Sequence, residues 1–276
     1  MKFAGGMYWK SQGPYEYLVK TFAGNRQKRI GSRSPETEQA YEAFTSRKAE
    51  IEARMTDLQA AVVEAERLNR ALRVGRVPAI VVNVLRAIEK AGLSSYFTVV
   101  GTHALYAYEA AAGVRIEGVM VPQDVDVLGD AQRHVCFLTD MERPDVSMLS
   151  ILQRVDKSFR RKDDHRETAI NSKGIEVDFL RRPQQDSAPR PGRLFAYEED
   201  QWRAQIPASA PKFEQVVVAT TGKMARMSTI DPRVFIGYKT WMANAAENRD
   251  PCVRRRDQLQ ADVVRTLMDQ GLLLSR

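Results

Sequence analysis

The feature that most constrains this chain is an apolar segment that ends in a glycine and a hydroxyl residue. The segment leads directly into Gly101-Thr102, and further along the sequence reads Asp124-Val125-Asp126. A glycine and a hydroxyl after a strand form a turn that binds phosphate through backbone N–H groups and the side-chain oxygen. Two carboxylates at positions i and i+2 of a strand share one face. The sequence therefore predicts a site for a nucleoside triphosphate (NTP) with Mg²⁺ or Mn²⁺.

A third carboxylate follows in the short apolar run Gly174–Leu180. Alternation places Glu176, Asp178 and Leu180 on one face of the expected strand and the apolar residues on the other. An acid inside an apolar strand is costly unless it is paired or binds metal. Two-metal phosphoryl transfer uses such a group to bind and activate the attacking hydroxyl. Each acid alone is typical of a solvated residue, whereas the ordered set favours a functional site with Asp124, Asp126 and Asp178 as metal ligands.

These motifs, in this order, resemble those of the DNA polymerase β-type nucleotidyltransferase superfamily. Within it the chain is similar to a bacterial branch of stand-alone proteins akin to the abortive-infection nucleotidyltransferase toxins. That branch usually has Gly-Ser where this chain has Gly101-Thr102, so the hydroxyl is retained and a methyl group is added. Downstream, residues 235–241 resemble the apolar-Lys-apolar helix motif of the branch, and residues 248–257 resemble its Arg-x-x-x-Arg-Asp motif.

The resemblance implies an α+β fold with a polymerase-β-like nucleotidyltransferase palm, in which a mixed sheet is covered by helices. A basic N-terminal hairpin and long helix are expected over residues 1–76, the palm over 77–228, and a C-terminal helical subdomain over 229–276. The boundary at residue 76 rests on the helix-breaking sequence Gly75-Arg76-Val77-Pro78.

The resemblance also implies roles for individual residues in the transfer of a nucleoside monophosphate to an acceptor hydroxyl, with release of pyrophosphate. The predicted catalytic residues are Asp124, Asp126, Asp178 and Lys239. The predicted nucleotide-binding residues are Gly101, Thr102, Arg115, Arg249, Arg256 and Asp257. Arg115 fits a phosphate ligand or a surface ion pair equally well. Asp257 is expected to orient Lys239 or Arg249, or to contact the nucleotide or the acceptor.

The N-terminal region combines aromatic and basic residues. Residues 15–22 and 27–30 predict a hairpin across Ala23-Gly24-Asn25, and its aromatic side chains are interleaved with Lys and Arg. Such residues stack on bases and bind phosphates, but a small hairpin also needs aromatics for packing. Ser34-Pro35 predicts a helix start, and the apolar residues up to Leu72 predict a buried stripe or a coiled-coil-like partner.

The net charge is +7, from 42 basic and 35 acidic residues. Most of the excess lies in residues 1–90, which contain 16 basic and 10 acidic residues. A basic extension favours a polyanionic acceptor such as RNA, with tRNA included, over a protein acceptor. The other interpretation is a helical surface that is basic without binding a polyanion. Neither the base of the NTP nor the oligomeric state is predicted by the sequence.

The chain has two widely separated cysteines and no long apolar run. These features favour a reducing cytoplasm and no membrane span. The first ten residues lack the apolar core of a secretory signal. The alternative function is a catalytically silent relative that binds nucleic acid or regulates a partner. Another two-metal enzyme, such as a phosphatase, lacks support because the sequence has no His-Asp or Asp-rich cluster beyond these acids. The toxin-like resemblance further suggests a toxin–antitoxin role.

Hydrophobic periodicity predicts the remaining elements. Helices are expected from Pro78 to about Ala91, from about His103 to Ala112, after Pro144, after Asp231 and from Cys252 to Leu267. Strands are expected at 97–100, 168–170, 175–180, 214–219 and 224–227. The charged run from Phe159 to His165 predicts a solvated loop.

Overall fold

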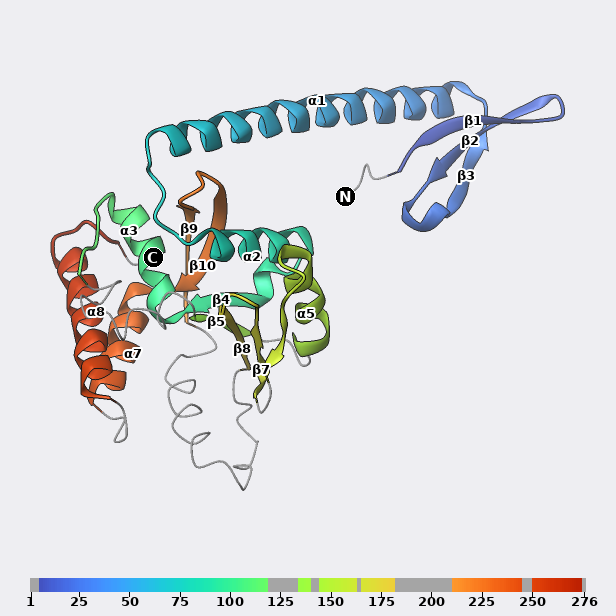
Figure 1. Ribbon diagram of the computed structural model, residues 1–276. Coiled ribbons are helices and arrows are strands. Elements are labelled where there is room, and N and C mark those ends of the chain that lie inside the picture. Colours follow the sequence, from blue (N-terminus) through green and yellow to red (C-terminus); the bar gives the residue numbers. More distant parts are fainter. Residues whose placement is uncertain are drawn as a thin grey trace. The chain divides into compact units, whose positions relative to one another are not determined.

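The computed structural model of the protein describes residues 5–118, 134–139, 144–162, 165–181, 210–244 and 250–274 (Figure 1). The chain divides into two compact units, a smaller unit of residues 1–67 and a larger unit of residues 68–276. Each unit is described by itself below. The predicted division of the larger unit into a palm and a C-terminal subdomain stays a prediction.

The smaller unit is a three-stranded antiparallel sheet followed by a long helix. The strands lie in the order β1 (Met7–Gln12), β2 (Tyr15–Thr21) and β3 (Gln27–Ser32), and the helix is α1 (Pro35–Ala71). The predicted hairpin is confirmed as β2 and β3, and Gly24 has a φ of 76° in the turn between them. Strand β1 was not predicted, because its six residues carry a weak apolar signal.

Helix α1 begins at the predicted cap. The Ser34 N–H donates to Thr37 Oγ1 (2.8 Å), and the Thr37 N–H donates to Ser34 Oγ (3.4 Å), so the two residues cap the helix reciprocally. Phe44 is the buried residue of the helix. The apolar stripe farther along is exposed rather than buried: Leu58 is 53% exposed and Val62 is 44% exposed. Within the smaller unit this part of the stripe is therefore not buried, and the coiled-coil-like partner stays a prediction.

The larger unit is built on a mixed seven-stranded sheet with the order β6-β7-β8-β5-β4-β10-β9. The strands are β4 (Phe97–Val100), β5 (His134–Thr139), β6 (Arg160–Lys162), β7 (His165–Ile170), β8 (Glu176–Arg181), β9 (Lys212–Val218) and β10 (Met224–Ile230). β5 runs parallel to β8 and β10 runs parallel to β4, whereas the other neighbours are antiparallel. The mixed sheet and its helices confirm the predicted α+β class.

Helices cover the sheet of the larger unit. They are α2 (Ala79–Lys90), α3 (Leu105–Ala112), α5 (Pro144–Val155), α7 (Pro232–Asn244) and α8 (Pro251–Asp269). α7 and α8 pack side by side, as do α2 and α5 (Figure 1). Under α2 and α5, the rings of Phe97, Phe137 and Phe179 form a cluster with centroids 5.6 to 6.2 Å apart. Each such buried ring contributes roughly 1.5–3 kcal/mol by removal from water.

One predicted loop is wrong. The charged run after Phe159 forms the edge strand β6, which pairs with β7. Phe159 itself is buried, and Lys162 forms an ion pair with Glu176 at 2.6 Å. Charged side chains are common on edge strands because one side of the strand faces solvent. A run of charge therefore did not distinguish an edge strand from a loop.

No helix in the described part of the chain is both long enough and apolar enough to cross a membrane.

Candidate active site

The predicted phosphate-binding turn joins β4 to α3. The chain leaves β4 at Val100, passes through a single 3-10 turn (Gly101–Ala104) and continues into α3. Gly101 has a φ of 74°, a left-handed conformation that a residue with a side chain adopts only at a cost. The turn precedes a helix N-terminus, where backbone N–H groups without helical partners attract anions. Gly101 and Thr102 thus lie in the geometry that the phosphate-binding prediction requires.

Asp178 lies in the centre of the sheet, in line with the end of β4. One row of cross-strand neighbours runs from Val100 through Cys136 and Asp178 to Thr168. The Asp178 side chain is buried, with the residue 8% exposed. Thr168 Oγ1 donates to Asp178 Oδ1 at 2.7 Å, and Cys136 Sγ donates to Asp178 Oδ2 at 3.7 Å. Asp178 and Val100 are two strands apart, about 10 Å at ordinary strand spacing.

Strand direction places the turn at Gly101 at the end of the sheet where β5 and β8 begin. Because β4 and β5 are antiparallel, Gly101 follows β4 at the end where β5 begins with His134. His134 is paired with Glu176, the first residue of β8. The segment that contains Asp124 and Asp126 comes before β5 and lies outside the described residues.

The described residues hold one part of the predicted metal site. Among them, no group of three His, Cys, Asp or Glu side chains is arranged to hold a metal ion. Asp178 is the described member of the predicted ligand set, and a carboxylate is the oxygen ligand that Mg²⁺ and Mn²⁺ prefer. The donor chemistry of Asp178 therefore fits such an ion. A complete site requires Asp124 and Asp126 as well.

Lys239 and Asp257 form a buried ion pair between α7 and α8. Lys239 Nζ donates to Asp257 Oδ1 at 2.6 Å, and the two side chains are 3% and 0% exposed. Of the two orienting interactions expected for Asp257, the one with Lys239 is present. Arg249, the other expected partner, lies outside the described residues. A charge this deeply buried is tolerated because an opposite charge and hydrogen bonds compensate its loss of hydration.

Gln260 connects α8 to the phosphate-binding turn. Its side-chain Nε2 donates to Thr102 Oγ1 at 3.2 Å, and Gln260 is fully buried. Gln260 comes three residues after Asp257, so both side chains lie on one face of the helix. A chain of polar side chains therefore leads from Lys239 through α8 to Thr102. Gln260 is not among the site residues predicted from the sequence, although its spacing from Asp257 is a usable signal.

Glu109 anchors the segment that leads toward Asp124. Its Oε2 accepts from Arg76 Nη1 at 2.8 Å and from the Ile116 N–H at 2.9 Å. Burial raises the pKa of Glu109, while the hydrogen bond from Ile116 and the charges of Arg76 and Arg115 act in the opposite direction. Arg115 is exposed, and its charge acts on Glu109. Neither of its two predicted roles is excluded by this placement.

The remaining predicted residues are only partly placed. Arg256 is half-buried on α8, and its Nε is buried without a hydrogen-bond partner among the described residues. His103, which follows Thr102, is 2% exposed and packs near Tyr106 with ring centroids 5.9 Å apart. The structure therefore brings Thr102, Lys239 and Asp257 into one connected region through Gln260, and it places Asp178 in the row that ends at the turn.

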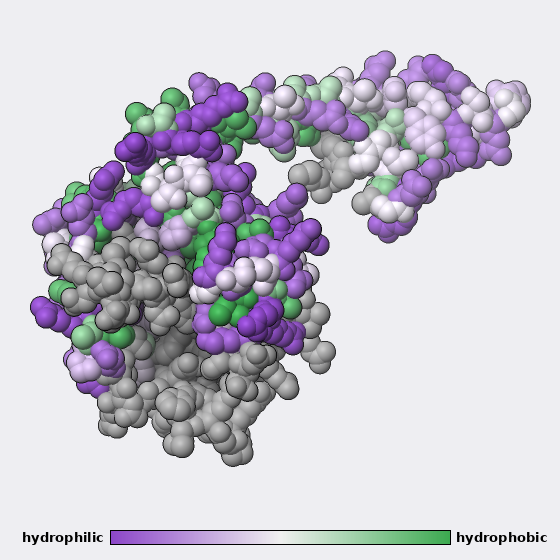
Figure 2. Space-filling model, viewed as in Figure 1, coloured by the Kyte–Doolittle hydropathy of each residue, from purple (hydrophilic) through white to green (hydrophobic). Residues whose placement is uncertain are grey.

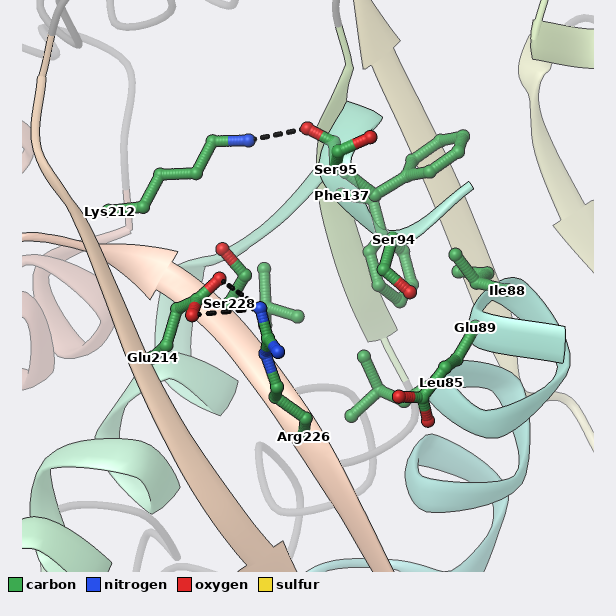
Figure 3. Close-up of a pocket in the computed structure, with 12 residues that line it drawn as sticks. Leu85, Ile88, Glu89, Ser94, Ser95, Phe137, Lys212, Glu214, Arg226 and Ser228 are labelled. Carbon is green, nitrogen blue, oxygen red and sulfur yellow. Dashed lines mark hydrogen bonds and ion pairs between the residues drawn. The ribbon is translucent and has the colours of Figure 1, made fainter. Parts of the chain in front are cut away.

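A separate cavity of about 260 Å³ lies on the opposite face of the sheet (Figure 3). Leu85 and Ile88 of α2 line it together with Phe97 and Phe137, whose side chains point away from the Asp178 face. Charged residues at its edge are already engaged, since Arg226 forms an ion pair with Glu214 at 2.9 Å. The cavity is therefore distinct from the candidate site.

The site combines a glycine turn between a strand and a helix with a buried carboxylate two strands away in a mixed sheet. A family model described as "Nucleotidyltransferase" matches residues 79–275. The chain belongs to this nucleotidyltransferase family. No curated protein matches the chain, and no solved structure matches it. The more specific likeness to toxin-like members stays a prediction.

Proposed function

We propose that this nucleotidyltransferase transfers a nucleoside monophosphate from an NTP to an acceptor hydroxyl and releases pyrophosphate. The observation that carries the proposal is the row from Val100 to Asp178, which aligns the phosphate-binding turn with a buried carboxylate. Membership of the family supports nucleotidyl transfer in general. The specific reaction, its dependence on a metal ion and the acceptor are proposed here.

Each residue of the proposed site has a physical role. Backbone N–H groups after Gly101 and the Thr102 hydroxyl bind the terminal phosphates. Thr102 Oγ1 accepts from Gln260, so its own O–H is directed to another acceptor, which we take to be a phosphate oxygen. Asp178 either accepts the proton of the attacking hydroxyl or orients that hydroxyl. The Lys239–Asp257 pair holds α7 against α8, and Lys239 is the proposed counter-charge for the leaving pyrophosphate.

Asp124, Asp126 and Asp178 would hold Mg²⁺ or Mn²⁺. The bound ion would neutralise charge on the phosphates and lower the pKa of the attacking hydroxyl.

Replacement of the acids tests the proposal. Asp124→Ala/Asp126→Ala and, separately, Asp178→Asn should abolish transfer of label from α-labelled NTP to cell RNA or protein. Asp269→Asn, an exposed acid at the end of α8, is the matched control and should leave transfer unchanged. Omission of Mg²⁺ and Mn²⁺ should have the same effect as loss of the acids. Undiminished transfer by the double variant would refute the proposal.

RNA, including tRNA, is the favoured acceptor, and a protein hydroxyl is the second. The basic excess in residues 1–90 supports a polyanionic acceptor. A toxin-like role for the transfer and a cytoplasmic site of action belong to the same proposal. Incubation with each labelled NTP and either total RNA or protein lysate identifies both the base and the acceptor. Label in the protein fraction alone would exclude RNA.

The alternative is a silent relative that keeps the fold and binds nucleic acid or a partner. The two functions differ in Mg²⁺-dependent NTP binding, measured by titration calorimetry. Binding that is lost in Asp124→Ala/Asp126→Ala supports the enzyme. Binding of no NTP by the wild-type chain supports the silent relative.

A further inference from the structure

The two faces of the sheet in the smaller unit differ in what covers them. Trp9 packs against Tyr41 of α1 with ring centroids 5.8 Å apart, and Lys20 Nζ lies 5.4 Å from the ring of Phe44. Gly31 also faces the helix, since an added Cβ would lie 3.2 Å from Thr37. α1 therefore covers the face that contains Trp9, Lys20 and Gly31. Because side chains alternate along each strand, their immediate neighbours point to the other face.

The other face, called the open face below, is rich in aromatic, basic and amide side chains. Its members follow from the strand register and comprise Tyr8, Lys10, Gln12, Tyr15, Tyr17, Val19, Thr21, Gln27, Arg29 and Ser32. Contacts among them confirm the assignment. The Arg29 guanidinium lies over the Tyr17 ring, 3.1 Å from its centroid, and Tyr8 Oη donates to Gln27 Oε1 at 3.3 Å.

Charge is distributed unequally between the faces. The three strands contain a single acidic residue, Glu16, and the register places it on the helix side. There it forms an ion pair with Arg33 at 2.5 Å, and Arg33 also contacts Glu38 on α1 at 2.7 Å. The open face therefore carries Lys10 and Arg29 without a carboxylate among its members. On the side shown in Figure 2, hydrophilic residues over these strands alternate with residues of nearly neutral hydropathy.

The exposure of the aromatic side chains matches a stacking surface. Tyr15 is 62% exposed and Tyr8 is 37% exposed. The Tyr15 and Tyr17 rings lie 6.4 Å apart on the same face. Aromatic side chains of a small unit normally pack inward, because burial of the ring is favourable. On the helix side the inward packing is supplied by Trp9, Leu18 and Phe44. On the open face Val19 is 6% exposed, whereas the Tyr15 ring stays largely exposed.

We propose that the open face binds single-stranded RNA. The tyrosine rings stack on unpaired bases, Lys10 and Arg29 bind the phosphates, and the amides of Gln12 and Gln27 donate to base edges or to the 2′-hydroxyl. Stacking requires bases that are free of a partner strand, which a duplex does not offer. The evidence for RNA binding comes from the open face alone, whereas the role of the bound RNA as the acceptor rests on the proposed function.

Binding of the full chain to a short unstructured RNA with a fluorescent label tests the inference, measured by anisotropy in the absence of NTP. Tyr15→Ala should weaken binding by about fivefold or more, as expected for loss of one stacked base. Tyr15→Phe keeps the ring and should bind like the wild type. Lys10→Ala/Arg29→Ala should weaken binding and reduce the slope of log affinity against log salt by about 1.4, the value for two phosphate contacts.

The control variant is Arg47→Ala/Arg54→Ala, which removes two exposed charges from α1. The inference requires it to retain most of the affinity. Equal losses in the two double variants would show binding by net charge alone and overturn the inference. Tighter binding of an RNA duplex than of the unstructured RNA would also overturn the inference. The same holds if the chain binds a protein from a cell lysate and does not bind RNA. Circular dichroism confirms that each variant is folded.

The inference and the proposed function fail separately. Asp124→Ala/Asp126→Ala should bind the RNA with wild-type affinity while it transfers no label. If the wild-type chain binds RNA through the open face but transfers no label, the inference holds and the proposed enzymatic function is refuted. Transfer of label to a protein, with no effect of the open-face variants on RNA binding, would support the enzyme and overturn the inference.

Discussion

The two units of this protein differ in whether they bury charged side chains. The larger unit buries Lys239 and Asp257 as a pair, and it buries Asp178 within its sheet. The smaller unit keeps its ion pairs at the surface, where Arg33 is about half exposed. Exposed pairs contribute little to stability, whereas a buried charge depends strongly on its partner. The larger unit is thus organised around fixed polar groups, and the smaller unit presents its polar groups outward.

The largest predicted effect comes from breaking the buried pair. Lys239→Met should lower the free energy of unfolding of the larger unit by about 3–5 kcal/mol, because it leaves Asp257 charged and buried. Lys239→Met/Asp257→Leu should recover much of this loss. Denaturant unfolding followed by circular dichroism measures both. A single variant with wild-type stability would mean that the pair is not buried in solution.

In the smaller unit the sensitive position is apolar. Phe44→Ala should cost about 3 kcal/mol, the usual loss for a buried phenylalanine. It should unfold the smaller unit and leave NTP binding by the larger unit intact. Leu58→Ala, at a residue of the same helix that is 53% exposed, should change stability by less than about 0.5 kcal/mol. Equal losses in the two variants would mean that the exposed stripe of α1 is covered in solution.

A smaller effect is expected at the polar connection to the phosphate-binding turn. Gln260→Ala removes one hydrogen bond to Thr102, worth about 0.5–1.5 kcal/mol, and should raise the Kd for NTP by about two- to tenfold. Thr102→Val should also weaken NTP binding. If Gln260 acts by orienting the hydroxyl, adding Gln260→Ala to Thr102→Val has little further effect. Fully additive losses would show that Gln260 acts elsewhere.

The smallest effect concerns pH. Burial raises the pKa of Glu109 above its ordinary value of 4.5, so the folded chain binds a proton that the unfolded chain releases. This contribution to stability is complete below pH 4.5 and is lost as pH rises through the raised pKa. Glu109→Gln should remove this dependence while keeping an acceptor for Ile116. Unfolding measured at several pH values should give a flatter profile for the variant than for the wild type.

Local signals in the sequence predicted much of the fold. The cap at Ser34-Pro35, the strand before Gly101 and the alternation around Asp178 each depend on neighbouring residues alone, and the structure has all three. The strands β9 and β10 were predicted for the same reason. By contrast, the strand β6 was read as a loop, because an edge strand does not need an apolar pattern.

The parts of the site that the sequence did not predict depend on contacts between distant segments. Gln260 meets Thr102 across 158 positions of the chain. The position of β5 between β4 and β8 likewise follows from the sheet order and not from its own residues. The resemblance supplied candidates such as Lys239 and Asp257, and the fold supplied the partner of each. The roles of Asp124, Asp126 and Arg249 stay predictions.

Cys136 gives the candidate site a reporter of its own. Its thiol is partly accessible and adjoins the Asp178 carboxylate, while Cys252 is exposed elsewhere and serves as an internal reference. The rate at which a thiol reagent modifies Cys136, relative to Cys252, should fall when a ligand occupies the neighbouring space. Ligand candidates can therefore be ranked by mass spectrometry before any acceptor is known.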